Sequence, residues 1–396
     1  MHQEIHDYLS ELEQAVDLLK SLFIAKDELI ELLATCAIAQ EHLLIVGPPG
    51  TAKSELIKRF ALYCRADDGG YFEYLLTRFT EPNEIFGPVN IAAFREGEGM
   101  FRQTEGMLPQ AQITFLDEVF KANSAILNAF LTILNERVFY NGSQRDKVPL
   151  IFAVGATNNV PEENELAALY DRFLLRVWTD NVEETLFDDL FQRGWQLEQE
   201  RIASGYGLQE QPITSTAALQ ALYRALEQVD MSQVAGPYRT AVRQIRAEGI
   251  QLSDRRVIKL LKLIAASALR AGRMVATPAD FWVLRHVWND PEQIPHLQTI
   301  VDRYMDEGSS QAHRPERSLL EINADLQQLT ADQAQLKTDI DYGDYLQQVE
   351  GVRRQLQRHS AAEAAAETAE RQKHEQLVAT TERLIGQVMA LLEEQL

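Results

Sequence analysis

Apolar residues follow two different spacings along the chain, and the change between them divides the sequence. Residues 1–40 are predicted to be helical, because apolar side chains recur there at intervals of three and four. These residues are Leu9, Leu12, Val16, Leu19 and Phe23. Short apolar runs bounded by turn or helix signals then follow: LLIVG (43–47), YFEYLL (71–76), ITFLD (113–117), LIFAVGA (150–156) and LLRVW (174–178). Buried strands that alternate with helices predict an α/β fold with a parallel sheet covered on both faces.

Strand signals stop near residue 180, and the following segments carry helical spacing. These segments are VEETLFDDLFQRGWQLEQE, AALQALYRALEQV, DRRVIKLLKLIAASALRAG and ADFWVLRHVW. We therefore predict two domains, an N-terminal helix with an α/β core over residues 1–180 and an all-α domain over 181–306. The polar stretch EGSSQAHRPERS, interrupted by Gly308 and Pro315, is expected to be a linker.

The tail over residues 318–396 has its own apolar pattern. Leu319, Ile322, Leu326, Leu329, Leu336 and Ile340 follow three-four spacing, and Leu377, Leu384, Val388 and Leu391 repeat it. Between these seams lies AAEAAAETAERQ, which is polar and strongly helix-forming, and Tyr342-Gly343-Asp344 is expected to be a turn. The pattern favours a helical hairpin or coiled coil. The alternative, one long solvated helix, leaves two apolar seams exposed.

Composition restricts the classes of function. Thirty-eight basic residues against 59 acidic ones give a net charge of −21, which argues against a surface-wide nucleic-acid or anionic-membrane footprint but leaves room for a local basic patch. Cys36 and Cys64 lie in apolar helical patterns, so two buried thiols are expected. The N-terminus lacks the regions of a signal peptide, and no run approaches the roughly 20 apolar residues that cross a bilayer. We expect a cytoplasmic protein.

The segment GPPGTAKS is a candidate phosphate-binding loop between a strand and a helix. Its residues are Gly47, Pro48, Pro49, Gly50, Thr51, Ala52, Lys53 and Ser54. Backbone N–H groups at a helix N-terminus would face the anion, with Lys53 at the terminal phosphates of ATP and the Ser54 hydroxyl on Mg²⁺. The pattern G-x-x-x-x-G-K-[ST] asks for glycine where Ala52 stands. Because positive φ costs alanine about 1–2 kcal/mol, we predict right-handed helical dihedrals at Ala52.

Two further strands end in polar residues at the same edge of the predicted sheet. ITFLDE delivers Asp117, which can hold Mg²⁺ through water, and Glu118, which can orient and deprotonate the attacking water. LIFAVGATNN ends in Asn158 and Asn159. The Asn158 amide could bond the attacking water or the γ-phosphate; an ordinary Asn-Asn turn is the alternative.

These segments resemble an AAA+ ATPase of the MoxR family, and they are most similar to its RavA-like members. The resemblance spans roughly residues 20–290 and rests on GPPGTAKS, EIFGPVNI, GMLPQAQITFLDE, ILNAFLTILNER, VGATNN, ALYDRF and LSDRR, in that order. It implies an AAA+ nucleotide-binding core followed by an all-α lid domain. MoxR-type sequences typically carry alanine before the Walker A lysine, so Ala52 fits this family.

The resemblance also implies a role for each matching residue. Asn158 corresponds to sensor 1, and Arg172 in ALYDRF corresponds to the arginine finger that completes a neighbouring subunit's site. Arg255 in LSDRR corresponds to sensor 2 on the lid, with the adjacent Arg256 as the alternative. Arg176 is a second candidate for the finger. For each arginine, a surface ion pair is the competing interpretation.

Two inserted segments of this chain also resemble inserts that are characteristic of the clade to which the MoxR family belongs. FGPVNIAAFREGEGMFRQTEGML (86–108) corresponds to the insert in helix 2, with PVNIAA and GMFRQ expected as its strands. ERVFYNGSQRDKVP (136–149) is expected to be a β-hairpin with an Asn-Gly turn before sensor 1. Both would face the pore or the surface of a ring, and an ordinary surface hairpin is the alternative for each.

The leading hypothesis is an oligomeric, Mg²⁺-dependent ATPase, expected as a hexameric ring, that remodels or matures protein partners. The resemblance implies partners with von Willebrand factor A domains. The alternative is a nucleic-acid-engaging AAA+ motor that uses the hairpin with Arg145 and Lys147. A non-hydrolysing scaffold ranks last, because Asp117, Glu118 and Asn158 are all present.

Overall fold

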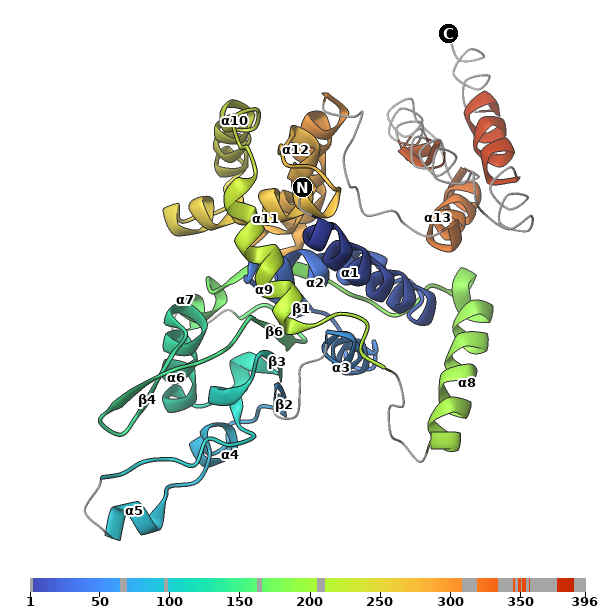
Figure 1. The fold of residues 1–396 in the computed structure, drawn as a ribbon. Coiled ribbons are helices and arrows are strands. Elements are labelled where there is room, and N and C mark those ends of the chain that lie inside the picture. Colours follow the sequence, from blue (N-terminus) through green and yellow to red (C-terminus); the bar gives the residue numbers. More distant parts are fainter. Residues whose placement is uncertain are drawn as a thin grey trace. The chain divides into compact units, whose positions relative to one another are not determined.

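Five parallel strands form the centre of the computed structural model, in the spatial order β2, β3, β6, β1, β7 (Figure 1). They are β1 (His42–Val46), β2 (Tyr71–Leu75), β3 (Ile113–Asp117), β6 (Phe152–Thr157) and β7 (Phe173–Trp178). Every residue of β1 and β6 is buried, as expected for strands covered on both faces. The prediction of an α/β fold with a parallel sheet is confirmed.

The structure describes residues 3–64, 70–95, 99–161, 166–204, 211–307 and 319–333, and in the tail also 345, 348–349, 351–353, 356 and 376–387. The chain divides into two units. The first comprises residues 1–21, 29–181 and 208–314, and the second comprises residues 22–28, 182–207 and 315–396. The sheet belongs to the first unit together with the helices of residues 208–314.

Helices of the first unit surround the sheet and continue into a helical lid. Those of the sheet region are α1 (Gln3–Leu22), α2 (Asp27–Ala39), α3 (Lys53–Tyr63), α4 (Pro82–Phe86), α5 (Ile91–Arg95), α6 (Ser124–Glu136) and α7 (Ala167–Tyr170). The lid contains α9 (Thr216–Ala225), α10 (Ala235–Ala247), α11 (Asp254–Arg270), the 3₁₀ helix η6 (Pro278–His286) and α12 (Ile294–Glu307). The helix predicted over 1–40 is broken between Leu22 and Asp27, where Ala25 has a φ of 56°.

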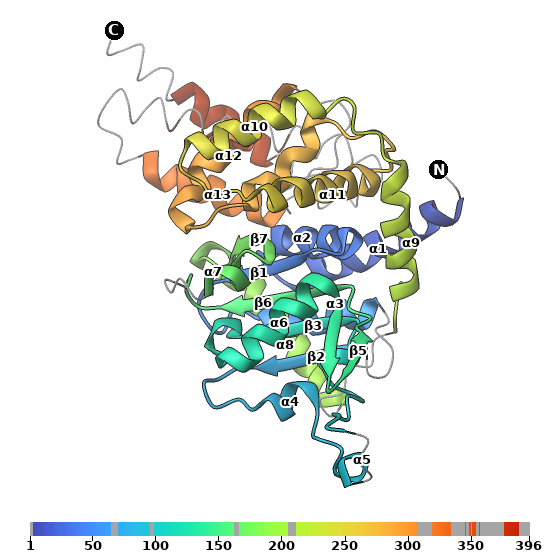
Figure 2. The same cartoon turned by 90° about the vertical axis from the view of Figure 1, so that its left-hand side faces the viewer.

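The lid packs along β7, at the edge of the sheet (Figure 2). Two buried arginines make this junction. Arg176 on β7 donates to the carbonyl oxygens of Val287 (3.3 Å) and Trp288 (2.6 Å), and Arg256 on α11 donates to Leu174 O (3.3 Å) on β7. Hydrogen bonds from charged donors to the backbone are among the stronger ones in proteins. They fix the lid against the edge strand, which is thereby covered.

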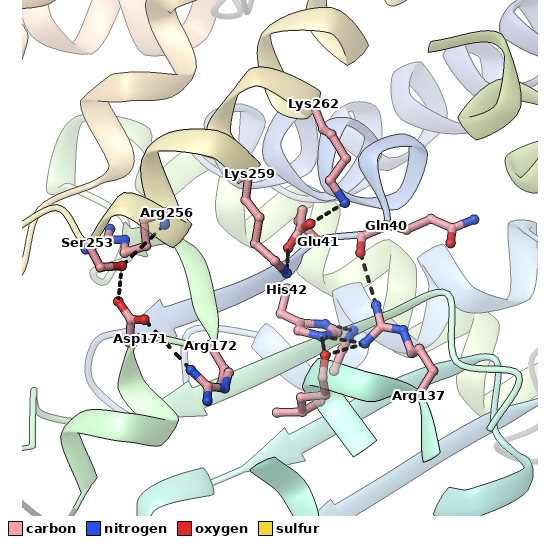
Figure 3. Close-up of polar contacts among 12 residues, drawn as sticks. Gln40, Glu41, His42, Arg137, Asp171, Arg172, Ser253, Arg256, Lys259 and Lys262 are labelled. Atoms are coloured by element: carbon pink, nitrogen blue, oxygen red, sulfur yellow. Dashed lines mark hydrogen bonds and ion pairs between the residues drawn. The ribbon is translucent and has the colours of Figure 1, made fainter. Parts of the chain in front are cut away.

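A buried carboxylate ties the lid to the start of β1 (Figure 3). Glu41 is 1% exposed, and it pairs with Lys259 (2.9 Å) and Lys262, both on α11. Farther along the same helix, the buried Arg270 pairs with Glu31 on α2 at 2.7 Å. Removing one partner of a pair that is buried on both sides, as Arg270–Glu31 is, costs roughly 3–5 kcal/mol. The lysine and arginine pairs together anchor α11 to the core at both ends.

His42 and Arg137 join the start of β1 to the end of α6 (Figure 3). His42 Nδ1 accepts from Ala153 N (2.9 Å), which leaves the proton on Nε2 to be donated to Leu134 O (2.8 Å). The Arg137 guanidinium donates to Leu134 O (2.6 Å) and Gln40 O (3.0 Å). Burial, and next the positive charge of Arg137, hold the pKa of His42 well below its ordinary value. His42 is therefore a neutral structural residue at physiological pH.

The described residues of the insert, 86–95 and 99–108, do not form a pair of strands. PVNIAA was predicted to be a strand, but α5 begins at Ile91 and only an isolated bridge joins Val89 to Arg102. The reason is the Asn90 side chain, which accepts from Ala92 N (3.1 Å) and so satisfies a free N–H in the first turn of the helix. The strand prediction for this insert was wrong.

The hairpin consists of β4 (Val138–Asn141) and β5 (Gln144–Lys147), paired antiparallel. The two residues between the strands are Gly142, with a φ of 61°, and Ser143, so Asn141 ends β4 and does not form the turn. Its amide instead accepts from Arg102 N (2.7 Å) and donates to Arg102 O (3.2 Å). This reciprocal pair fastens the hairpin to the insert.

The second unit contains α8 (Phe187–Ser204), α13 (Leu319–Asp332) and further helical segments of the tail. One apolar cluster joins three of these segments, and its buried members are Ile322, Leu326, Leu329, Tyr345, Val349, Val352, Leu356, Leu377 and Leu384. The Tyr345 hydroxyl donates to Leu329 O (2.8 Å). The predicted helical tail is confirmed, while the turn predicted at residues 342–344 lies outside the described residues. Among the described helices, none has both the length and the apolar character needed to span a membrane.

We expect the free energy of unfolding to fall in mild acid, because the buried His42 has to be protonated there. Its folded pKa is depressed, so the unfolded chain binds a proton more readily. The stabilising contribution is therefore complete above the unfolded value of about 6.5 and is lost as the pH falls towards the folded value, by up to roughly 1.4 kcal/mol per pH unit. The thermal midpoint of the wild type should fall between pH 7 and pH 5, and that of His42→Gln should fall less. The exposed His296→Gln serves as the control and should keep the wild-type slope; an equal slope in His42→Gln would contradict the assignment.

Candidate nucleotide-binding site

The loop of residues 47–52 leaves β1 and enters α3 through a turn that requires glycine at its first position. Gly47 has a φ of 153°, and a Cβ placed there would lie 1.8 Å from the carbonyl oxygen of Thr179. Gly47 N donates to Thr157 O (3.1 Å), and Thr179 N donates to Val46 O (2.9 Å). The ends of β1, β6 and β7 are thus held together directly beneath the loop.

Ala52 has left-handed dihedrals, with φ 59° and ψ 21°, as the residue that precedes α3. The prediction of right-handed dihedrals at this position was wrong. The carbonyl of Ala52 accepts from Leu56 N (3.1 Å), which is the first α-helical hydrogen bond of α3. The helix therefore begins directly after Ala52, and the turn between the loop and the helix falls on the dihedral angles of this residue. The residue carries about 1–2 kcal/mol of conformational strain for this turn. The general phosphate-loop pattern G-x-x-x-x-G-K-[ST] has glycine at this position, and glycine would carry no such strain.

Lys53 lies inside the turn of the loop. Its Nζ donates to the carbonyl oxygens of Gly47 (2.8 Å) and Pro48 (2.9 Å), and the residue is 8% exposed. Burial lowers the pKa of Lys53, and the carboxylates of Asp117 and Glu118 partly oppose that shift. A charged ammonium group enclosed by backbone and facing two carboxylates is suited to bind a phosphate oxygen beside a divalent cation.

The acidic pair at the end of β3 is brought together with Asn158 at the end of β6. Glu118 Oε1 accepts from Asn158 Nδ2 (2.7 Å) and forms an ion pair with Lys121 (2.9 Å). Asp117 Oδ1 accepts from Glu118 N (2.9 Å). Glu118 also has left-handed dihedrals, with φ 52° and ψ 44°, and this turns its side chain towards Asn158. Asn159 is exposed and contributes only its carbonyl, which accepts from the Thr157 hydroxyl (2.9 Å).

Arg172 lies at the other end of the strands from these residues. It directly precedes β7, whose first residue Phe173 pairs with His42, while Trp178 at the far end pairs with Val46 beside the loop. Five residue steps at about 3.3 Å each separate the two ends by roughly 17 Å, farther than an arginine side chain extends. The sheet therefore keeps Arg172 away from the phosphate loop of its own chain.

The Arg172 side chain is one-fifth exposed and lies next to Asp171, with 3.8 Å between Nη1 and Oδ2 (Figure 3). Burial, and then the charge of Arg255, lower the pKa of Arg172. Arg255 follows Ser253 by two residues and Arg172 follows Asp171 directly, so the two arginines lie on segments that a hydrogen bond joins. The Asp171 carboxylate accepts from the Ser253 hydroxyl (3.4 Å), which links the two chain segments. Two neighbouring cations on a surface are suited to bind a polyanion such as a triphosphate.

The other two candidate arginines point into the structure. Arg256 is 1% exposed and donates to Leu174 O and to Asn289 Oδ1 (3.0 Å), and burial lowers its pKa to about 9. Arg176 is equally buried and lies 4.0 Å from the centre of the Tyr170 ring. Both hold the lid on β7. Arg255 is therefore the member of the LSDRR pair whose side chain stays partly accessible.

Sequence reasoning missed Lys121, which forms the ion pair with Glu118. It follows the acidic pair by three residues on the short 3₁₀ helix η2 (Val119–Lys121). An i, i+3 arrangement of opposite charges was visible in the sequence. Sequence reasoning also missed the tie between Glu41 and the two lysines of α11, because no local pattern connects residues more than 200 positions apart.

Comparisons with known proteins identify the family of this chain. Residues 10–220 match the family described as "MoxR domain in the MoxR-vWA-beta-propeller ternary systems", and residues 238–301 match an AAA lid domain. The uncharacterised protein MJ0812 of Methanocaldococcus jannaschii is 39% identical over 71% of this chain and 72% of its own length. The chaperone MoxR1 of Mycobacterium tuberculosis is 28% identical over 42% of this chain and 43% of its own length.

A solved structure shares the fold. The crystal structure of a protein from Cytophaga hutchinsonii, provisionally described as an ATPase, superposes with a TM-score of 0.59 and covers 79% of this chain and 98% of its own. Its sequence identity is 16%, so this similarity concerns the fold alone.

Replacing Ala52 with glycine should stabilise the protein. Glycine relieves about 1–2 kcal/mol of left-handed strain in the folded state. It also raises the conformational entropy of the unfolded chain, which lowers the free energy of unfolding by about 0.4–1 kcal/mol. We expect a higher thermal midpoint for Ala52→Gly without nucleotide. In the interior of α9, where the backbone is right-handed, Ala221→Gly should lower the midpoint, because glycine there costs about 0.5–1 kcal/mol. A lower midpoint for Ala52→Gly would mean that the residue is not left-handed in solution.

Proposed function

Because the chain belongs to the MoxR family of AAA+ ATPases, we propose that it hydrolyses ATP in an oligomeric ring and uses the cycle to remodel or mature a protein partner. One observation carries this proposal. The phosphate loop, the acidic pair and Asn158 gather at the end of the strands, whereas Arg172 and Arg255 lie together at the opposite end. Each chain therefore carries two complementary halves of a nucleotide site.

The first half binds the nucleotide and prepares the water. Residues 47–54 cradle the phosphates, with Lys53 against the terminal ones. Glu118 orients the attacking water and takes its proton, and Asn158 holds the Glu118 carboxylate in place through their hydrogen bond. Lys121 shares the same carboxylate oxygen, so release of Glu118 from Lys121 would accompany activation.

Magnesium fits the residues present at this edge. The Ser54 hydroxyl is exposed at the start of α3, and Asp117 lies at the end of β3, which β6 separates from β1. Within the described residues no group of three or more histidine, cysteine, aspartate or glutamate side chains could hold a metal by itself. Mg²⁺ is typically bound by one or two protein oxygens together with substrate phosphates and water. Ser54 and Asp117 would hold the ion, which supplies charge neutralisation between the phosphates.

The second half serves the next subunit. Arg172 would act as the arginine finger, and Arg255, as its neighbour on α11, would contact the same triphosphate from the lid. Both would thus act in trans, since the strand length separates them from the loop of their own chain. Closed repetition of such a head-to-tail contact produces a ring, for which we propose six subunits.

The partner we propose carries a von Willebrand factor A domain. The matched family is described by its occurrence in MoxR-vWA-beta-propeller systems, and MoxR1 is named a chaperone. Affinity capture with the Glu118→Gln protein held in its ATP state would identify the partner, because this variant stalls the cycle after binding.

A nucleic-acid motor is the alternative function. The hairpin carries Arg145 and Lys147 on β5, but Arg145 lies 3.6 Å from the Glu136 carboxylate. The net charge of −21 also opposes such binding. Salt-sensitive DNA binding that accelerates ATP turnover would favour this alternative.

Glu118→Gln should abolish hydrolysis and retain ATP binding. The amide keeps the size of the side chain but cannot accept a proton, and loss of a general base typically costs 10²–10⁴-fold in rate. Turnover is measured by phosphate release and binding by a fluorescent ATP analogue. Hydrolysis that persists at the wild-type rate would reject the role of Glu118.

Mixing inactive variants tests the trans arrangement. Lys53→Ala and Arg172→Ala subunits should each be inactive alone and regain activity together, because some interfaces then combine an intact loop with an intact finger. A mixture of Lys53→Ala with Arg255→Ala should behave in the same way. If Arg255 acts on its own chain, that second mixture stays inactive at every ratio. Arg256→Lys is unsuitable for this test, since it would loosen the lid.

A further inference from the structure

The most exposed large apolar side chain of the described residues follows the end of β2. Phe79 is 90% exposed, and Leu75, the last residue of the same strand, is 58% exposed. The next residue, Leu76, donates from its N–H to Asp117 O (2.9 Å). This apolar pair therefore lies at the same end of the sheet as the acidic pair of the nucleotide site.

Phe79 is held outward by a built turn. Thr77 N donates to the Thr80 hydroxyl (2.9 Å), Phe79 N donates to the Thr77 hydroxyl (3.2 Å), and Thr80 N donates to Thr77 O (3.2 Å). The Asn123 amide, at the start of α6, donates to Thr80 O (2.7 Å). The backbone under the ring is thus ordered before any contact forms. An apolar group that is fixed in this way loses little entropy when it becomes buried.

The face that carries the two accessible arginines has an exposed apolar residue of its own. Ile258 is 66% exposed and follows Arg255 by three residues, one turn of α11. Its neighbours Arg256 and Lys259 point to the core through the contacts described above. Ile258 therefore lies on the outer side of the helix, next to Arg255.

We propose that Phe79 and Ile258 belong to the two opposite faces of a head-to-tail interface between copies of this chain. The inference rests on the proposed function. A second copy is the occupant that the site itself requires, because only another subunit can bring Arg172 and the start of α11 with Arg255 to the end of the sheet where Phe79 lies. The charges agree with this pairing, since that end carries Asp117 and Glu118 and the opposite face carries the arginines. Apolar anchors surrounded by charged groups are typical of residues that dominate an interface.

Such an interface predicts a specific behaviour of single-face variants. Phe79→Glu damages one face and Ile258→Glu the other, so each variant alone should remain a monomer of 44.9 kDa with Mg²⁺ and a non-hydrolysable ATP analogue. Mixed in equal amounts, the two variants retain one intact face each. They should form a species of twice the subunit mass, and no larger one, by light scattering after gel filtration.

Milder variants guard against misfolding as an explanation. Phe79→Ser and Ile258→Ser should weaken assembly roughly 30-fold, as expected for apolar interface anchors. Their circular dichroism and their binding of a fluorescent ATP analogue should remain those of the wild type. Leu18→Glu, on the 39% exposed Leu18 of α1, is the matched control and should leave assembly unchanged.

The outcomes separate this inference from the proposed function. If Phe79→Glu and Ile258→Glu assemble like the wild type, or if their mixture stays monomeric, the interface is wrong, although the Lys53 and Arg172 mixing test can still succeed. Dissociation by Leu18→Glu would likewise reject it, because the effect would then not be specific to these faces. If the wild type itself fails to assemble with the analogue, the proposed ring is what fails.

Discussion

The single direction of the five strands is the constraint on which the rest of the structure depends. Parallel strands bring their carboxyl ends to one edge of a sheet, and that edge collects the phosphate loop, the acidic pair and Asn158. Arg172 precedes a strand, so the same rule places it where the amino-terminal ends of the strands lie. No adjustment of side chains can overcome the length of a strand, so Arg172 stays away from the loop of its own chain.

The lid strengthens this division because it is fixed to the core by buried cations. Arg176 and Arg256 donate to backbone carbonyls across the junction with β7. Glu41 holds two lysines of α11, as Figure 3 shows. Such groups are stable only while their partners stay in place. The segment that carries Arg255 is therefore held beside the segment that carries Arg172, as the bond from Ser253 to Asp171 also shows.

Two residues of the candidate nucleotide-binding site have strained backbone dihedrals. Ala52 and Glu118 both have left-handed dihedrals, which residues other than glycine rarely adopt. One completes the turn into α3, and the other turns the carboxylate towards Asn158. Strain of this kind persists when surrounding hydrogen bonds fix the conformation, as the bonds of Gly47 and Glu118 do here. No propensity read from the chain would have placed alanine or glutamate in that region.

The sequence by itself determined the strands, the helical lid, the helical tail and the family, because buried runs and motifs such as GPPGTAKS and ITFLDE are local patterns. It misjudged the insert, where the cap at Asn90 favoured a helix, and it could not tell which of Arg255 and Arg256 is buried. Only the tertiary structure decided these points, along with the dihedrals of Ala52 and the tie from Glu41 to α11. The physical reason is that each depends on contacts between segments far apart in the chain, whose partners no local spacing can specify.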